Sequence, residues 1–521
     1  MKRSSWIYWL GFFLLLKLLL HIRVNGMWSF HRDELLYLVL GRHLDWGYAS
    51  VPPAIGFWAW FASNILGGSV GAVRLISTLF GTATVLMTVL MARELKPSIS
   101  ESNGVFSTIL IGLAGLLCGA FLRPGMLFMP VVFDLFYWTL LCWLFLKYIN
   151  TGNNRWILFF AGFAALGLLN KYSVLIFLFA LLPGLLLSPN RKLFAKPVLY
   201  YSILLGLLIV LPNLVWQYRH QFPVFRHMSE LAATQFVHVS LSGFFSDQLM
   251  FFMPALPVWL TGLYFLLVRK EAVSWRIFGW MYLTVLVVLL FFKAKSYYSL
   301  GAYPVLIAAG AAYIEEMTRH TRTWLRPVLV VFMLVIGLIT MPATLPVFKP
   351  EMEASYLKKL AAYPGLDGLL RWEDGRYYPL PQDFADMMGW QEIAGIAGKA
   401  WEQIPDKTNA AIYAENYGLA GGIEYFGKKY GIEDVLSFSD NYRYWLPDSL
   451  PSDFNTLVYV NDELGDDMTG FFEKITLAGQ LDMPLSRQQG VQVYICEGPT
   501  PAFFERIGTA IRNAKEEREI E

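Results

Sequence analysis

The stretch "FHRDELLYLVLGRHLDWGYASVPPAIGFWAW", from Phe30 to Trp60, places a cluster of charged side chains between two apolar runs. Its ionisable residues include Arg32, Asp33, Glu34, Arg42, His43 and Asp45. The apolar run before it is long enough to enter a membrane. Charges close to hydrocarbon are costly and are usually kept for function. The stretch therefore predicts a membrane protein with a functional loop at the bilayer surface.

The composition supports a membrane protein. Of the 521 residues, 56% are hydrophobic and only 16% are charged, whereas soluble domains carry about 25% charged residues. The net charge of +2 is too small to indicate a nucleic-acid partner. The three cysteines, Cys118, Cys142 and Cys496, offer no disulfide framework.

Long apolar runs predict about eleven transmembrane helices, since each needs about 20 apolar residues. The candidate spans begin near Ser5, Val70, Gly104, Val131, Trp156, Ser173, Val198, Leu249, Arg276, Ser299 and Pro327. The first run has a basic start and is interrupted by Lys17, which favours a retained helix over a cleaved signal peptide.

Basic residues orient these spans, because cytoplasmic loops are enriched in Lys and Arg. The basic clusters that fall on one side are Lys2 with Arg3, Arg93 with Lys96, Lys147 with Arg155, "NRKLFAK", "RKEAVSWR" and "RHTRTWLR". We expect that side to be the cytoplasm. The loop that contains Asp33 then lies outside the cell membrane, as does the C-terminus.

The composition changes after Phe348 and becomes polar. The segments "NAAIYAENYGLAGGIEYFGKKYG", "TLVYVND" and "VQVYICEG" predict a strand, turn and helix followed by further strands. The expected fold class is an α-helical polytopic membrane domain over residues 1–348, followed by an extracytoplasmic α/β domain over residues 349–521.

The predicted external face gathers further ionisable and phenolic residues. They are Arg123, Asp134, Lys171, Tyr172, Lys293, Lys295, Tyr297 and Tyr298, with His220, His227 and His238 in a long loop. Basic residues on that face run against the usual charge distribution, and an anionic ligand such as a lipid phosphate would explain them. A carboxylate beside such a ligand could act as a general base for an incoming hydroxyl or amine. The loop histidines are expected to be ordinary polar residues rather than metal ligands.

Structural roles compete with these functional ones. Asp33 and Glu34 suit the N-terminus of a short interfacial helix beginning "DELLYLVLGRHL", and Pro52 and Pro53 suit the start of the next helix. Asp134 is harder to explain in this way, because an unpaired carboxylate within a membrane costs about 2.5–3.5 kcal/mol. A functional role is favoured for Asp134 over a structural pair with Arg123 or Lys171.

Several motifs occur in an order typical of one bacterial family. They are "DELLYL", "GRHLDWGY", "PPAIGFWAW", "RPGMLFMPVVFDLFYW", "GLLNKYS", "LPNLVWQ", "KAKSYYSLGAYPVLIAAGA" and, in the tail, "YAENYGLAGGIEYFG". The chain resembles the dolichyl-phosphate-mannose-protein mannosyltransferase-like glycosyltransferases of the GT-C superfamily, which include the aminoarabinose transferases of lipid A. The resemblance covers essentially the whole membrane part.

This resemblance implies an inverting transfer of a sugar from a polyprenyl-phosphate donor to a glycan, lipid or protein acceptor at the extracytoplasmic face. It places the principal catalytic carboxylate at Asp33, with Glu34 beside it, and a second aspartate at Asp134. The implied residues for the donor phosphate are Lys293, Lys295, Tyr297 and Tyr298, with Lys171 and Arg123 as further contacts. Arg32, His43 and Asp45 would line the same first-loop cavity.

One position departs from the family pattern. Many relatives carry an acidic residue immediately before the two prolines, where this chain has Ser50 and Val51. The resemblance implies that this pair contributes to a metal site and to phosphate binding in aminoarabinose transferases. Its absence argues against lipid A aminoarabinose transfer, and Asp45 could compensate. The sequence establishes no cofactor, and a divalent metal stays an open alternative.

Two other functions remain open from the sequence. A lipid-linked glycan ligase or polymerase has similar chemistry but usually a large central external loop. A secondary transporter would place its charges near the bilayer midplane and contain repeated halves. The charges here gather at one predicted face and no repeat is visible, so the glycosyltransferase is favoured.

Overall fold

The computed structural model describes residues 5–95, 104–466 and 468–516, which fall into two compact units. The first unit comprises Met1–Met27, Gly71–Asn213 and Leu231–Phe348, and the second comprises Trp28–Val70, Leu214–Glu230 and Lys349–Glu521. Three residues of the predicted basic loops lie outside the described residues: Lys2, Arg3 and Lys96. The division places the Asp33 loop with the C-terminal part of the chain, a grouping that the sequence did not suggest.

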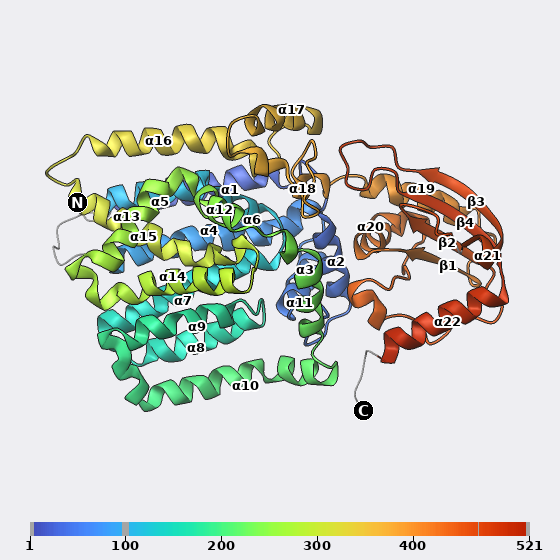
Figure 1. Ribbon diagram of the computed structural model, residues 1–521, viewed down its shortest axis with the longest axis horizontal. Coiled ribbons are helices and arrows are strands. Elements are labelled where there is room, and N and C mark those ends of the chain that lie inside the picture. Colours follow the sequence, from blue (N-terminus) through green and yellow to red (C-terminus); the bar gives the residue numbers. More distant parts are fainter. Residues whose placement is uncertain (1–4, 96–103, 467, 517–521) are drawn as a thin grey trace. The chain divides into compact units, whose positions relative to one another are not determined.

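The first unit is a helical bundle in which the long helices run side by side (Figure 1). Its α-helices are α1 (Ser5–Val24), α4 (Val70–Glu94), α5 (Val105–Leu117), α6 (Gly119–Met126), α7 (Pro130–Thr151), α8 (Arg155–Leu168), α9 (Val174–Leu186), α10 (Pro197–Arg219), α12 (Leu241–Phe251), α13 (Leu256–Val268), α14 (Arg276–Phe291), α15 (Tyr303–Met317) and α16 (Leu325–Thr340). Short 3₁₀ helices connect them: η2 (Pro189–Ala195), η3 (Phe236–His238), η4 (Met253–Ala255), η5 (Lys270–Trp275), η6 (Ser296–Ala302) and η7 (Met341–Ala343).

Helices begin within a few residues of every predicted span start except Leu249, which lies inside α12. By length and composition, six of the described helices could cross a membrane alone, and up to nine spans result if each bent helix pair counts as one. The prediction of about eleven also includes α8 and α15, which have only 14 and 15 residues. The chain is a multi-pass membrane protein, as predicted.

A break between α5 and α6 explains the lysine in the first helix. The two helices meet at Cys118 with a bend of 56°, which leaves backbone carbonyls without helical partners. The buried Lys17 ammonium donates to the carbonyl oxygens of Gly115 and Phe121, both at 3.0 Å. One turn later, His21 Nε2 lies 3.1 Å from the carbonyl oxygen of Leu122. The polar side chains of α1 thus provide hydrogen-bond partners for backbone carbonyls near this break, which hydrocarbon could not provide.

The second unit contains a four-stranded sheet with the order β1-β2-β4-β3, in which β1 and β2 are parallel and the other neighbours antiparallel. The strands are β1 (Ala410–Ala414), β2 (Thr456–Asn461), β3 (Phe472–Gln480) and β4 (Gln492–Pro499). The helices are α2 (Arg32–Arg42), α3 (Ala54–Ile65), most of α11 (Pro223–Thr234), α17 (Pro350–Ala361), α18 (Gln382–Ala385), α19 (Trp390–Glu402), α20 (Tyr417–Phe426), α21 (Met468–Phe471) and α22 (Pro501–Glu516). The 3₁₀ helices are η8 (Asp367–Leu370), η9 (Gly427–Tyr430) and η10 (Asp440–Tyr444).

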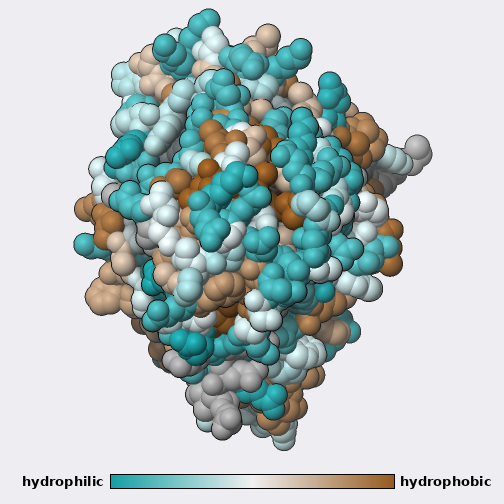
Figure 2. All heavy atoms as spheres, turned by 90° about the vertical axis from the view of Figure 1, so that its right-hand side faces the viewer, coloured by the Kyte–Doolittle hydropathy of each residue, from teal (hydrophilic) through white to brown (hydrophobic). Residues whose placement is uncertain are grey.

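Both faces of the central strand β2 are covered. Leu457 and Tyr459 share an apolar cluster with Phe503 of α22, so Val458 and Val460 point to the opposite face, where α19 packs. The side of the unit that carries β3, α21 and α22 presents a mostly hydrophilic surface (Figure 2). This unit is therefore built like a soluble α/β domain.

The strands predicted from the tail are confirmed at β1, β2 and β4. The sequence did not predict β3, because most of its residues are exposed or only partly buried. A strand without a buried face lacks the alternation by which a strand is recognised.

The Lys17 contacts give a stability prediction. Replacing Lys17 with Met keeps the side-chain length but removes the ammonium hydrogen bonds to two buried carbonyl groups, so we expect a loss of about 1–3 kcal/mol. Thermal unfolding of the purified protein in detergent would measure it, with the exposed neighbour Leu16→Met as the matched control. A K17M protein as stable as the wild type would contradict the prediction, because it would mean that the burial of an ammonium group costs as much as its bonds contribute.

Candidate functional site

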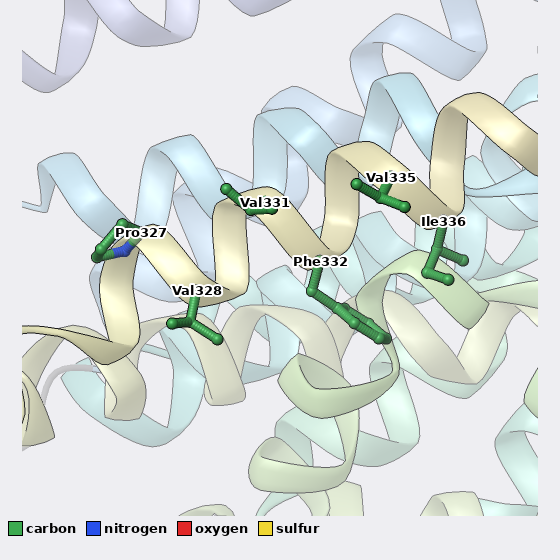
Figure 3. Close-up of a pocket in the computed structure, with 6 residues that line it drawn as sticks. All are labelled: Pro327, Val328, Val331, Phe332, Val335 and Ile336. Carbon is green, nitrogen blue, oxygen red and sulfur yellow. The ribbon is translucent and has the colours of Figure 1, made fainter.

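The first unit offers an apolar groove and a polar cluster, and only the polar cluster can do chemistry. The groove follows the outer side of α16, and all its lining residues come from that helix: Pro327, Val328, Val331, Phe332, Val335 and Ile336 (Figure 3). None of these side chains can bind a proton or an anion. A surface of this kind on a membrane protein is expected to face lipid.

The polar cluster begins with Asp134 in the first turns of α7. Its carboxylate is 5% exposed and accepts a hydrogen bond of 2.7 Å from the Ser173 hydroxyl. Ser173 precedes α9, in the predicted "NKYS" connection. The charge of Lys171 also acts on Asp134. The structure therefore brings Asp134 and Lys171 together, as one of the sequence-based alternatives expected.

Lys171 also contacts the tyrosine pair of η6. Its ammonium nitrogen lies 5.1 Å from the ring centroid of Tyr297 and 4.7 Å from that of Tyr298. The two rings pack edge to face at 4.7 Å, and the Lys295 ammonium lies 5.9 Å from the Tyr297 ring. Ring faces stabilise a cation without using its N–H donors. A lysine held as Lys171 is can still donate to the oxygens of a phosphate, and Lys295 adds a second positive charge beside the same rings.

The two other predicted phosphate contacts are placed differently. The Arg123 guanidinium donates to the carbonyl oxygen of Ala343 at 2.6 Å, a bond that links α6 to η7. Lys293 is exposed and has a φ of 50°, in the left-handed region that side-chain-bearing residues rarely adopt. The contacts of Arg123 are thus structural in part, and Lys293 presents its charge to the surroundings.

Sequence reasoning missed a second carboxylate beside η6. Asp247 of α12 accepts a hydrogen bond of 2.6 Å from the Ser296 hydroxyl, directly next to Lys295 in the chain. Its neighbour Gln248 accepts from Ser299 at 2.7 Å. The signal was present in "FFSDQLMF", where a carboxylate stands in an otherwise apolar helix, by the same argument that selected Asp134.

In the second unit, the capping role expected from the sequence falls on Glu34. The Glu34 carboxylate is fully buried and accepts from the His31 backbone N–H at 2.8 Å, while His31 Nδ1 lies 3.1 Å from the Asp33 backbone nitrogen. The bond from the His31 N–H to Glu34 caps the start of α2. The same arrangement leaves the Asp33 side chain for other contacts.

Asp33 and Arg32 both contact Tyr417, the first residue of α20. The Tyr417 hydroxyl donates to Asp33 Oδ1 at 2.7 Å, and the Arg32 guanidinium lies 4.6 Å from the centre of the same ring. Burial and the Asp33 charge raise the pKa of Tyr417 well above its usual value, so the phenol stays protonated. Sequence reasoning missed Tyr417, since nothing local connects residues so far apart in the chain.

His31 carries a positive charge near the Asp33 carboxylate. Its Nε2 lies 3.6 Å from Asp386 Oδ2 and 3.8 Å from Asp383 Oδ1, and Asp386 also pairs with Arg487 at 3.0 Å. Burial alone would lower the pKa of His31, but the carboxylates of Asp383, Asp33 and Asp386 outweigh it and raise the pKa to about 9. The imidazole is therefore protonated at neutral pH.

The two remaining first-loop candidates lie beyond the C-terminal end of α2. The His43 ring stacks on Trp445, with centroids 4.1 Å apart, and burial together with Arg42 lowers its pKa. Asp45 is exposed, and its carboxylate accepts from the Trp46 N–H at 2.6 Å. His43 is a neutral imidazole stacked on Trp445, and Asp45 forms a local turn bond. Neither of these interactions involves Asp33.

The positions before the two prolines meet the C-terminal segment instead. Asp440, which has a φ of 50°, hydrogen-bonds Ser50 and interacts with the charge of His227. Across residues 5–95, 104–466 and 468–516, no three His, Cys, Asp or Glu side chains gather as a metal-binding group. The residues at this position therefore do not fit a divalent metal.

The sequence is similar to that of known glycosyltransferases. The family model "Dolichyl-phosphate-mannose-protein mannosyltransferase" matches residues 50–216. A lipid A galacturonosyltransferase, RgtD from Rhizobium johnstonii, is 28% identical over 240 residues, which cover 44% of this chain. The chain spans about half the length of that curated relative, 46%.

The crystal structure of ArnT from Cupriavidus metallidurans in the apo state matches 94% of this chain and 98% of its own, with a TM-score of 0.61 at 15% identity. The same protein bound to undecaprenyl phosphate matches over the same shares, with a TM-score of 0.60 at 13% identity. The chain has the fold of ArnT. The prediction of a polytopic helical membrane protein with a small α/β part in the C-terminal segment is confirmed, as is the resemblance to the mannosyltransferase-like family.

Within this GT-C fold, the charge of His31 gives a pH prediction. The pKa of His31 is about 9 in the folded protein and near 6.5 when unfolded, so its contribution is complete below about pH 6.5 and is lost as pH rises through 9. The shift corresponds to about 3 kcal/mol. Melting temperatures of the wild type and His31→Asn should therefore differ most at pH 6.5 and converge by pH 10. A difference that is independent of pH would contradict the protonated state.

Proposed function

We propose that this protein is a membrane glycosyltransferase that moves a sugar from a polyprenyl-phosphate donor to a glycan, lipid or protein acceptor, with inversion at the anomeric carbon. The observation that carries the proposal is the cluster around Lys171, where a lysine, two tyrosines and a carboxylate meet. The ArnT-like fold and the similarity to a lipid A galacturonosyltransferase support it. The sugar is a hexose or pentose, and lipid A is the first acceptor to test.

The proposed reaction needs one proton acceptor and one site for a departing phosphate. Asp33 takes the proton from the acceptor hydroxyl as its oxygen attacks the anomeric carbon. The bond between that carbon and the phosphate oxygen breaks, and the electron pair stays on the polyprenyl phosphate. Lys171 and Lys295 stabilise the charge on the departing phosphate, and Tyr297 and Tyr298 hold the lysines. Asp134 fixes the connection that carries Lys171, through its bond to Ser173.

The proposal includes a location and an orientation. The chain would reside in a bacterial inner membrane, with the Asp33 loop and residues 349–521 on the extracytoplasmic side. The basic loops predicted for the cytoplasm support this orientation. The hydrophilic surface of the second unit also suits an aqueous compartment (Figure 2).

The carboxylate assignment predicts the effect of Asp33→Asn. This change removes the proton acceptor and keeps the shape of the side chain, so transfer should fall about 10²–10⁴-fold. Cells that carry only the variant would be compared with wild-type cells by mass spectrometry of their envelope glycans. Asp434→Asn, at a carboxylate that is 82% exposed, is the matched control and should leave transfer unchanged. Intact transfer in D33N cells would show that Asp33 is not the base.

The phosphate assignment predicts weaker lipid binding in Lys171→Met. Losing one charged hydrogen-bond donor should raise the undecaprenyl phosphate concentration needed for half-maximal thermal stabilisation by about 10–100-fold. Lys196→Met is the matched control, because Lys196 also lies over a tyrosine ring, 5.2 Å from the centroid of Tyr148, in a predicted cytoplasmic loop. Equal effects of the two variants would contradict the assignment.

A further inference from the structure

Helix α20 approaches α2 so closely that a side chain at its glycines would make unusually tight contacts. It begins with "NYGLAGG", residues 416–422. A Cβ atom on Gly421 would lie 3.2 Å from the backbone carbonyl of Leu35, and one on Gly418 would lie 3.2 Å from the Cβ of Arg32. On the other side, a Cβ on Gly422 would lie 3.0 Å from the Trp390 ring. The glycines therefore let the two helices meet almost backbone to backbone, with Trp390 behind α20.

The start of α20 is fixed by its own cap. The Asn416 side chain accepts from the N–H groups of Gly418 and Leu419 at 3.0 and 3.1 Å. This N-cap defines the first helical residue, which is Tyr417. With the helix start fixed and the helix pressed against α2, the phenol of Tyr417 has a fixed position opposite Asp33.

The resulting hydrogen bond controls the direction of a carboxylate. The terminal torsion of an aspartate is broad, so an isolated carboxylate has no single preferred orientation. The raised pKa of Tyr417 keeps its O–H a donor, and the bond of 2.7 Å engages Asp33 Oδ1. Arg32 covers the face of the ring at 4.6 Å and limits its movement. These contacts select one orientation of Asp33.

We propose that Tyr417 is a positioning residue for the transfer reaction: its hydroxyl holds Oδ1 of Asp33 so that Oδ2 receives the proton of the acceptor. The C-terminal part of the chain then takes part in catalysis and is more than a cover or a binding accessory. This inference rests on the proposed function, because it requires that Asp33 be the proton acceptor.

Tyr417→Phe tests the inference, because it removes the hydroxyl and keeps the ring beneath Arg32. The full-length protein would be assayed in detergent, with a lipid extract of the producing organism as the source of donor and acceptor. We expect the maximal rate to fall about 10–100-fold, as for a misdirected catalytic group. The amount of extract that gives half the maximal rate should stay within about twofold, since no substrate contact is removed.

Tyr425→Phe is the matched control. Tyr425 lies on the same helix, and its hydroxyl donates to the carbonyl oxygen of Gly68 at 2.8 Å, away from Asp33. This variant loses one buried hydrogen bond of the same kind and should keep the wild-type rate. A Y417F protein as fast as Y425F would overturn the proposal.

A double variant separates positioning from folding. In the D33N background the hydroxyl has no base to orient, so Tyr417→Phe should slow the residual reaction less than twofold. A folding defect would slow the reaction equally in both backgrounds, and that result would overturn the proposal. If D33N alone transferred sugar at the wild-type rate, the proposed function would fail as well, whereas a normal rate in Y417F with a strong effect of D33N would refute only the role of Tyr417.

Discussion

Hydrocarbon offers no hydrogen-bond partner, so each polar group within the helical bundle has to find one inside the protein. This constraint explains why Lys17 stands in the first helix, where it satisfies two carbonyls at the break before α6. It also explains why Asp134 is paired with Ser173 close to Lys171. In the first case the partnership maintains a bend in the backbone, and in the second it holds a lysine beside a pair of aromatic rings. The same requirement therefore explains a structural contact at Lys17 and a contact within the candidate site at Asp134.

Each compact unit holds a different set of candidate side chains. The first unit supplies cations and phenols, which suit a phosphate, and the second supplies Asp33 with a protonated histidine and a tyrosine near it. The electrostatic surroundings differ accordingly. Lys171 is stabilised by ring faces that leave its donors unused, whereas the α2 terminus is a dense network of acids and bases with little exposure. Such a network favours a fixed geometry over adaptability.

Much of the candidate site could be predicted because charge is conspicuous in an apolar chain. Asp134, Lys171 and Lys295 stand out on that basis, the family resemblance adds the two tyrosines of η6, and the structure places all five in one cluster. The dipeptide of Asp33 and Glu34 could not be resolved in the same way, since both suit a helix start. Only the structure assigns the cap to Glu34 and the contact with Tyr417 to Asp33.

The fold could be predicted equally well where hydrophobic periodicity or the length of an apolar run indicated an element. Elsewhere it could not be predicted. The apolar runs indicated the helices, and the buried strand β2 and the partly buried strand β4 could be recognised in the tail. The exposed β3 gave no pattern, and the contact between α2 and α20 depends on glycines whose partners lie far away in the chain. Long-range packing of this kind leaves no trace in local composition.

The second compact unit is assembled from three separated segments, and this has a consequence for anyone who recombines relatives of this protein. Exchanging the tail alone would bring a foreign helix onto Leu35 and Arg32, where one added methyl group would force its neighbours to move by a few tenths of an ångström. The unit that can be exchanged is therefore discontinuous. Trp28–Val70 and Leu214–Glu230 would have to be exchanged together with Lys349–Glu521. A hybrid cut at the apparent linker after Phe348 would join sequences that match in hydropathy but not in helix-to-helix spacing.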